Sequence, residues 1–192
     1  MRHKEKRSLT VILVLVLMML GFSGCASRQP DTYIQALEAE VSYFDLLFHK
    51  HGGFTFRHHG EDAHVYLAQY RRDEQVLHER VGGLGTMGVH TFEGTILWGV
   101  TTEGDEPSEL RTIVAVDGAW SQKSFDLSVI DFDFAGFTSA GVSTEREEIE
   151  VGRRYALYHW QSGSVVWTPG DVFDPERLRE NENTLILYVI FE

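Results

Sequence analysis

The chain has 192 residues, of which 43% are hydrophobic, and its formal net charge at pH 7 is −12. Because a surface this acidic repels phosphate backbones, the charge argues against nucleic-acid binding, and we expect no nucleic-acid partner. The only cysteine is Cys25, which excludes an intramolecular disulfide. The fold must therefore be stabilised by its hydrophobic core.

The first 24 residues predict an export signal. A basic start precedes an apolar run at 9–20 that only Thr10 interrupts. Because a membrane-spanning helix needs about 20 apolar residues, this shorter run favours a cleaved signal peptide over an uncleaved membrane helix. Cleavage would leave 13 basic and 28 acidic residues, and so raise the negative charge to −15.

The segment at 20–25 reads LGFSGC, with small residues directly before Cys25. This motif resembles the lipobox of bacterial lipoproteins, except that Phe22 stands where the family usually has leucine. The resemblance implies that the bond after Gly24 is cut and that Cys25 is the lipid attachment site, through a thioether to diacylglycerol. We therefore expect an extracytoplasmic protein whose residues 25–31 form a short tether to a bacterial membrane.

Residues 32–192 predict a single β-rich domain. Thr32 and Gln35 have capping-box spacing, and apolar residues then recur at helical intervals. We expect an opening helix from about Thr32, although the aromatic segment 42–48 is also compatible with a strand.

Beyond Gly53 the pattern changes to short β segments separated by turn residues. Asp73-Glu74 and Asp117-Gly118 predict turns, and Asp174-Pro175 predicts the start of a short helix. Without repeating βα alternation, the fold class is mainly β. We expect an antiparallel β-sandwich of about eight strands, with an N-terminal helix and a short helix before the last strand. The expected strands are 54–58, 63–71, 75–81, 91–101, 110–116, 124–132, 153–160 and 184–191.

The segment 83–88 reads GLGTMG and fits the GxGxxG pattern of dinucleotide-binding loops. That mechanism requires a helix to begin at the glycines, yet residues 89–100 predict a strand. We therefore interpret the glycines as an inter-strand loop and expect no nucleotide cofactor.

Five of the nine histidines lie within residues 49–64, beside Glu61 and Asp62. If residues 60–62 form the loop of a hairpin, His58 and His64 face each other from opposite strands. Imidazole and carboxylate groups at such a loop can bind Zn²⁺ or Cu²⁺. The candidate metal ligands are therefore His58, His64 and Glu61. We favour solvated loop histidines with no bound cofactor and keep the Zn²⁺ or Cu²⁺ site as the alternative, because no strict metal-binding spacing is present.

No catalytic grouping stands out. Cys25 is assigned to lipid, no GxSxG serine motif occurs, and nothing singles out a pair of carboxylates for glycoside hydrolysis. Asp131 and Asp133 superficially resemble a calcium loop, but Ala135 stands where an oxygen ligand is needed. We therefore name no catalytic residue.

Taken together, these patterns favour a non-enzymatic binding or assembly module of the cell envelope, with an envelope protein as its partner. Edge strands and loops on a rigid β domain commonly carry such recognition. One alternative is a carrier of a small ligand or a metal that uses the histidine-rich segment 49–64. A second alternative is an envelope hydrolase.

Overall fold

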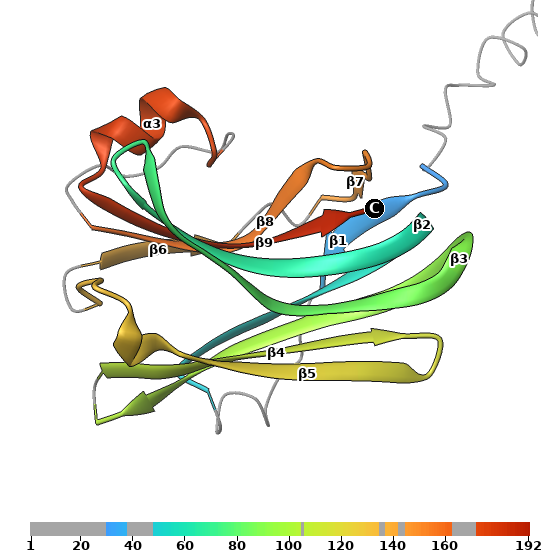
Figure 1. Ribbon diagram of the computed structural model, residues 1–192, viewed down its shortest axis with the longest axis horizontal. Helices are drawn as coiled ribbons and strands as arrows, with labels where there is room; N and C mark the ends of the chain where they lie inside the picture. The colour runs from blue at the N-terminus through green and yellow to red at the C-terminus, as the bar shows by residue number, and fades with distance from the viewer. Residues whose placement is uncertain (1–29, 38–47, 105, 135–136, 142–144, 163–171) are drawn as a thin grey trace, which may run out of the picture. The chain divides into compact units, whose positions relative to one another are not determined.

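The computed structural model (Figure 1) describes residues 30–37, 48–104, 106–134, 137–141, 145–162 and 172–192. The chain divides into two compact units, Met1–Pro30 and Asp31–Glu192, and all strands and helices named below lie in the second. No helix within the described ranges is both long enough and apolar enough to cross a membrane. The predicted signal peptide and Cys25 lie outside the described residues.

The second unit is mainly β, as predicted. Its strands are β1 (Tyr33–Ala36), β2 (Lys50–Arg71), β3 (Glu74–Glu103), β4 (Glu106–Val116), β5 (Ala119–Asp126), β6 (Phe137–Gly141), β7 (Glu147–Glu148), β8 (Arg154–Ser162) and β9 (Asn183–Phe191). They form one antiparallel sheet with the order β5-β4-β3-β2-β9-β8-β6, and β1 pairs with β2 and β7 beside this path. The hydrogen bonds thus join the described strands into one sheet, where we had expected two.

The opening helix predicted from Thr32 is wrong for the residues described there. Residues 33–36 form β1, which pairs in antiparallel register with residues 54–57 of β2. Ile34 is buried in the core in this arrangement. Pairing with a strand twenty residues away therefore outweighs the local helical spacing. The rest of that predicted helix, residues 38–47, lies outside the described residues.

The predicted hairpin loop at residues 60–62 is also wrong, because β2 runs through these residues without turning back. In the ladder with β3, Gly60 pairs with His90 and Asp62 pairs with Gly85. The β2–β3 register therefore shifts at this point, passing over Glu61 of β2 and residues 86–89 of β3. This irregularity is a β-bulge, and both strands curve strongly in Figure 1.

The bulge changes which side chains of β2 face the core. Before it, Phe54 and Phe56 point into the main core, whereas after it Val65 and Leu67 do so. An extra residue shifts the two-residue alternation by one position, so even-numbered residues beyond the bulge face the opposite side of the sheet. His64 and the other even-numbered residues of that stretch consequently lie on the face away from the main core.

Local turn and cap signals are confirmed. Chain reversals occur at residues 72–73 and 117–118, next to or at the predicted turn residues. The predicted short helix is α3 (Pro175–Glu180), with the Asp174 side chain accepting a hydrogen bond from Glu176 N–H. Leu178 of this helix packs into a second apolar cluster on the far face of β2 and β9.

Candidate metal centre

The bulge in β2 places Asp62 and His64 on one face of the sheet, because they stand two residues apart on a strand. Strand β9 supplies the third member of the group. In its ladder with β2, Phe191 pairs with Ala63 and Ile190 pairs with His64, so Glu192 follows directly beside Asp62. Phe191 points into the core, and Glu192 therefore points to the face that carries His64.

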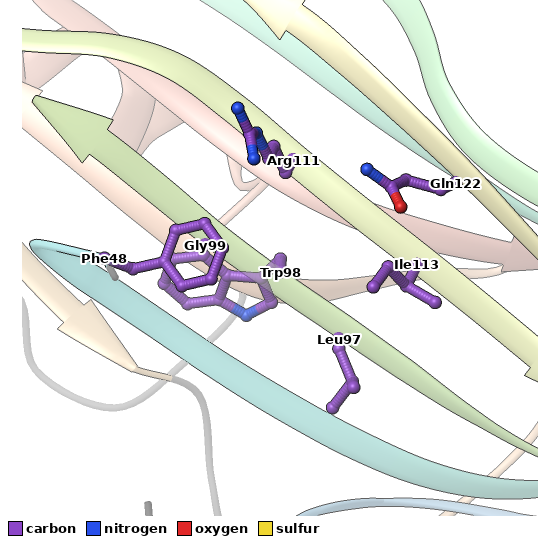
Figure 2. Close-up of a pocket in the computed structure, with 7 residues that line it drawn as sticks. All are labelled: Phe48, Leu97, Trp98, Gly99, Arg111, Ile113 and Gln122. Carbon is purple, nitrogen blue, oxygen red and sulfur yellow. The ribbon is translucent and has the colours of Figure 1, made fainter. Parts of the chain in front are cut away.

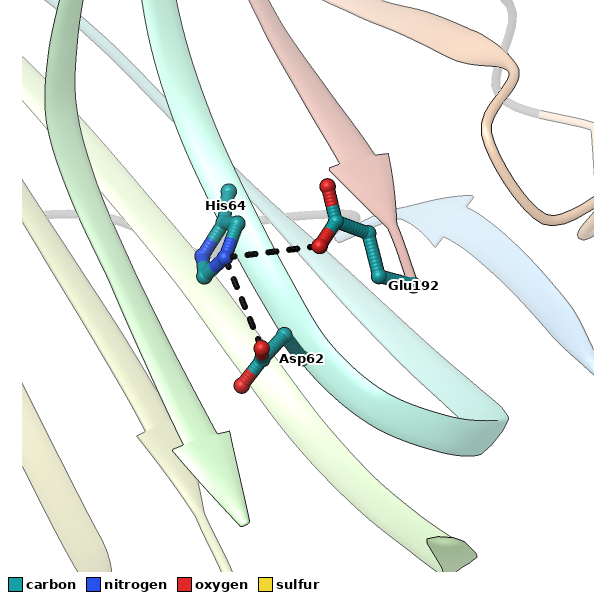
Figure 3. Close-up of side chains that lie close together, drawn as sticks. All are labelled: Asp62, His64 and Glu192. Carbon is teal, nitrogen blue, oxygen red and sulfur yellow. Dashed lines mark ion pairs between the residues drawn. The ribbon is translucent and has the colours of Figure 1, made fainter.

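The three side chains converge on the imidazole of His64 (Figure 3). His64 Nε2 lies 3.6 Å from Asp62 Oδ2 and 3.9 Å from Glu192 Oε2. One ligand atom from each residue lies within 4.8 Å of the others. These separations are too long for hydrogen bonds. They are close to the roughly 3.4 Å that separates two ligand atoms each about 2.1 Å from a tetrahedral zinc ion.

Burial differs across the group in a way that suits an ion site at a surface. The His64 side chain is 11% exposed, that of Asp62 30% and that of Glu192 56%. His64 Nδ1 is buried, and no described residue forms a hydrogen bond with it. An ion could therefore reach His64 Nε2 past the exposed Glu192 side chain.

The glycine-rich segment of β3 gives these side chains their space. Gly83 pairs with His64 and Gly85 pairs with Asp62 in the β2–β3 ladder. A Cβ at position 83 would stand 2.9 Å from His64 Nδ1, and one at position 85 would collide with Asp62 Oδ1. The segment that matches GxGxxG is thus strand rather than the predicted loop, and its glycines accommodate the candidate site.

The structure separates the three ligands predicted from the sequence. His64 joins the group, but His58 lies on the core face of β2, where its ring contacts Phe92 and Phe191. Burial lowers the pKa of His58 below its ordinary value. Glu61 is exposed at the bulge, and its main-chain N–H donates to the main-chain oxygen of Glu192. Asp62 takes the place that we had assigned to Glu61.

Sequence reasoning missed Asp62 and Glu192 as candidate ligands. The spacing Asp62-x-His64 is a detectable signal, because residues two apart share a face of a strand. Glu192 carries no local signal. Its place follows only from the pairing of β9 with β2, two strands more than 110 residues apart in the chain.

A pocket of about 240 Å³ lies elsewhere, on the face of β3, β4 and β5 that carries Leu97 and Ile113 (Figure 2). The ring of Phe48 lies against Gly99, and Arg111 and Gln122 add polar groups to the lining. Arg111 is paired with Glu109 at 2.6 Å. The volume is below the roughly 300–1,000 Å³ typical of small-molecule sites. We therefore take the metal-ligand group as the candidate site.

Comparisons with protein-family models, curated proteins and solved structures found no match to this chain. One neutral imidazole and two carboxylates carry a formal charge of −2, which a divalent cation neutralises. Imidazole suits zinc, copper, iron and nickel, and carboxylates complete such sites.

Proposed function

We propose that this protein binds a divalent transition-metal ion of the zinc class through Asp62, His64 and Glu192. The observation that carries the proposal is the convergence of three ligand atoms within 4.8 Å, from two neighbouring strands. Three protein ligands leave at least one coordination position to water or to a further ligand.

An ordinary ion pair is the simplest competing explanation, because both carboxylates lie within ion-pair distance of His64 Nε2. Neither carboxylate is within hydrogen-bonding distance of His64 Nε2. Two carboxylates also repel each other unless a cation lies between them. An ion at the centre would satisfy all three groups at once.

Zinc titration of the full-length chain, purified in detergent, tests the proposal. We expect about one equivalent of zinc to bind. His64→Gln, Asp62→Asn and Glu192→Gln should each weaken the affinity by at least about tenfold, or about 1.4 kcal/mol. Glu61→Gln is the matched control, because it removes a neighbouring carboxylate outside the group, and its zinc affinity should stay unchanged. A wild-type chain that binds no zinc would contradict the proposal.

We also propose that the protein is an extracytoplasmic lipoprotein tethered to a bacterial membrane through Cys25. The lipobox at 20–25 and the short apolar run before it support this placement. Cys25→Ser should abolish metabolic labelling with a fatty acid and leave unprocessed precursor. A wild-type chain that takes up no label would refute the anchor.

A second candidate function is docking of an envelope protein, and β5 is the surface that favours it. This strand ends the main path of the sheet, and its Trp120 side chain is 67% exposed. Exposed aromatic residues and edge strands both favour protein partners. Cross-linking in intact cells should capture one envelope protein, and Trp120→Ala should abolish the capture whereas His58→Gln and His64→Gln should not. If Trp120→Ala captured the partner as well as the wild type does, β5 would be ruled out as the docking surface.

We further infer that the two halves of the sheet pack together as the layers of a sandwich. Ring contacts across the core support this arrangement, because Trp98 of β3 lies 4.5 Å from Tyr158 and 6.2 Å from Trp160 of β8, measured between ring centroids. Such packing would hold β2 and β9 rigidly behind the metal ligands.

A further inference from the structure

The main chain of Glu192 is held by an unusual set of hydrogen bonds at the bulge of β2. Its oxygen accepts hydrogen bonds from the main-chain N–H groups of Glu61 at 2.6 Å and Asp62 at 3.1 Å. Its N–H donates to the main-chain oxygen of Asp62 at 2.9 Å. Glu192, which directly follows β9, is therefore fixed to Asp62, which also supplies a candidate ligand.

One side chain joins this set, and it comes from the opposite face of the sheet. His58 Nε2 lies 3.1 Å from the main-chain oxygen of Glu192. Because that oxygen can only accept, Nε2 must carry the proton. The His58 ring is 1% exposed and lies between Phe92 and Phe191, with ring centroids 5.5 and 5.1 Å away. The donor is therefore held in one orientation by packing.

Gly60 makes this hydrogen bond possible. A Cβ at position 60 would collide with both His58 Nε2 and the main-chain oxygen of Glu192. Any larger residue there would therefore separate the donor from its acceptor. The contact between His58 and Glu192 therefore depends on glycine at position 60.

We propose that His58 is a positioning residue of the metal site, which sets the affinity for zinc by fixing Glu192 although it cannot reach the ion. This inference rests on the proposed zinc site. The Glu192 carboxylate is 56% exposed and Glu192 directly follows β9, so the position of the carboxylate depends on how firmly the Glu192 main chain is held. His58 supports the Glu192 main chain from the core face of the sheet, whereas the Glu192 carboxylate lies near His64 on the opposite face.

The hydrogen bond from His58 to the Glu192 main chain should therefore affect the affinity for zinc. Groups that orient metal ligands typically change metal affinity by about 10- to 100-fold when they are removed. His58→Phe keeps a buried ring between the two phenylalanines but removes the donor. We expect it to weaken zinc binding by about tenfold or more. His58→Gln retains an N–H donor and should recover much of that loss.

The experiment measures the zinc Kd of the full-length chain by competition with a chromophoric chelator, well below each variant's Tm. His59→Phe is the matched control, because His59 is the exposed neighbour whose Nδ1 lies 3.0 Å from Thr91 Oγ1. It should bind zinc like the wild type. Gly60→Ala should also weaken zinc binding, because its Cβ would collide with both His58 Nε2 and the main-chain oxygen of Glu192, so His58→Phe is the variant that tests His58 alone.

A role in folding alone would lower the Tm of His58→Phe and leave the zinc Kd of the folded protein unchanged. That result, with normal binding by the wild type, would overturn this inference and leave the zinc site intact. If the wild type itself binds no zinc, the proposed function fails and this inference fails with it. Weakened binding in His58→Phe and Gly60→Ala, with His59→Phe unchanged, would support it.

Discussion

We expect His159 to make the folded domain less stable in acid, because its imidazole is buried. This residue lies on β8, pairs with Ile186 of β9 and is only 4% exposed. Because charging a buried imidazole requires its removal from water, burial lowers the pKa of His159 from 6.5 to about 4.

The lowered pKa of His159 makes the free energy of unfolding depend on pH. Well above pH 6.5 the imidazole is neutral in both the folded and the unfolded chain, so protonation of His159 does not change the free energy of unfolding there. Between pH 6.5 and about 4 the unfolded chain binds a proton that the folded chain does not, so the free energy of unfolding falls as the pH falls. At about 1.4 kcal/mol for each pKa unit, the loss attributable to His159 is about 3 kcal/mol.

Denaturant unfolding of the full-length chain at pH 7.5, 6, 5 and 4 measures this loss. His159→Gln cannot take up a proton and should lose about 3 kcal/mol less than the wild type over that range. The comparison with the variant is essential, because burial also lowers the pKa of His58 and adds to the wild-type loss. Free energies of unfolding that fall in parallel for the two proteins would refute the reasoning.

Two further changes test other parts of the account. Gly85→Ala should weaken zinc binding by about tenfold while the domain stays folded, because its Cβ would displace Asp62 Oδ1. An unchanged zinc Kd would show that Gly85 is not needed to make space for Asp62. Asp174→Ala should lower the free energy of unfolding by about 1 kcal/mol through loss of the α3 cap, and a denaturant curve that matches the Glu176→Gln control would refute that role.

Signals confined to a few neighbouring residues predicted the structure well. Asp117-Gly118 forms the expected turn because both residues adopt positive φ, as type I′ hairpin turns require. Asp174 and Pro175 start α3 because an aspartate cap and a proline at the first helical position both suit a helix start. In each case the physical cause lies within two or three residues of its effect.

The predictions that were wrong depend instead on pairing between strands that lie far apart in the chain. Apolar residues recur at helical intervals after Thr32, but residues 33–36 pair with β2 instead. This pairing buries Ile34 in the core. Gly60 is typical of a turn, yet it lies at a bulge in β2. The geometry of this bulge depends on pairing with β3 and on hydrogen bonds to Glu192, which follows β9. His64 was recognised because it belongs to a dense run of histidines. Glu192 was not, because its partner strand is far away in the chain.

X-ray absorption spectroscopy of the full-length chain with one equivalent of bound zinc identifies the atoms that ligate the ion. We expect one imidazole and two or more oxygen ligands at about 2.0–2.2 Å from the zinc. The imidazole contribution should disappear in His64→Gln and persist in His58→Gln. A spectrum with two or more imidazoles would contradict the account, because it would place the ion among other histidines than the one beside Asp62 and Glu192.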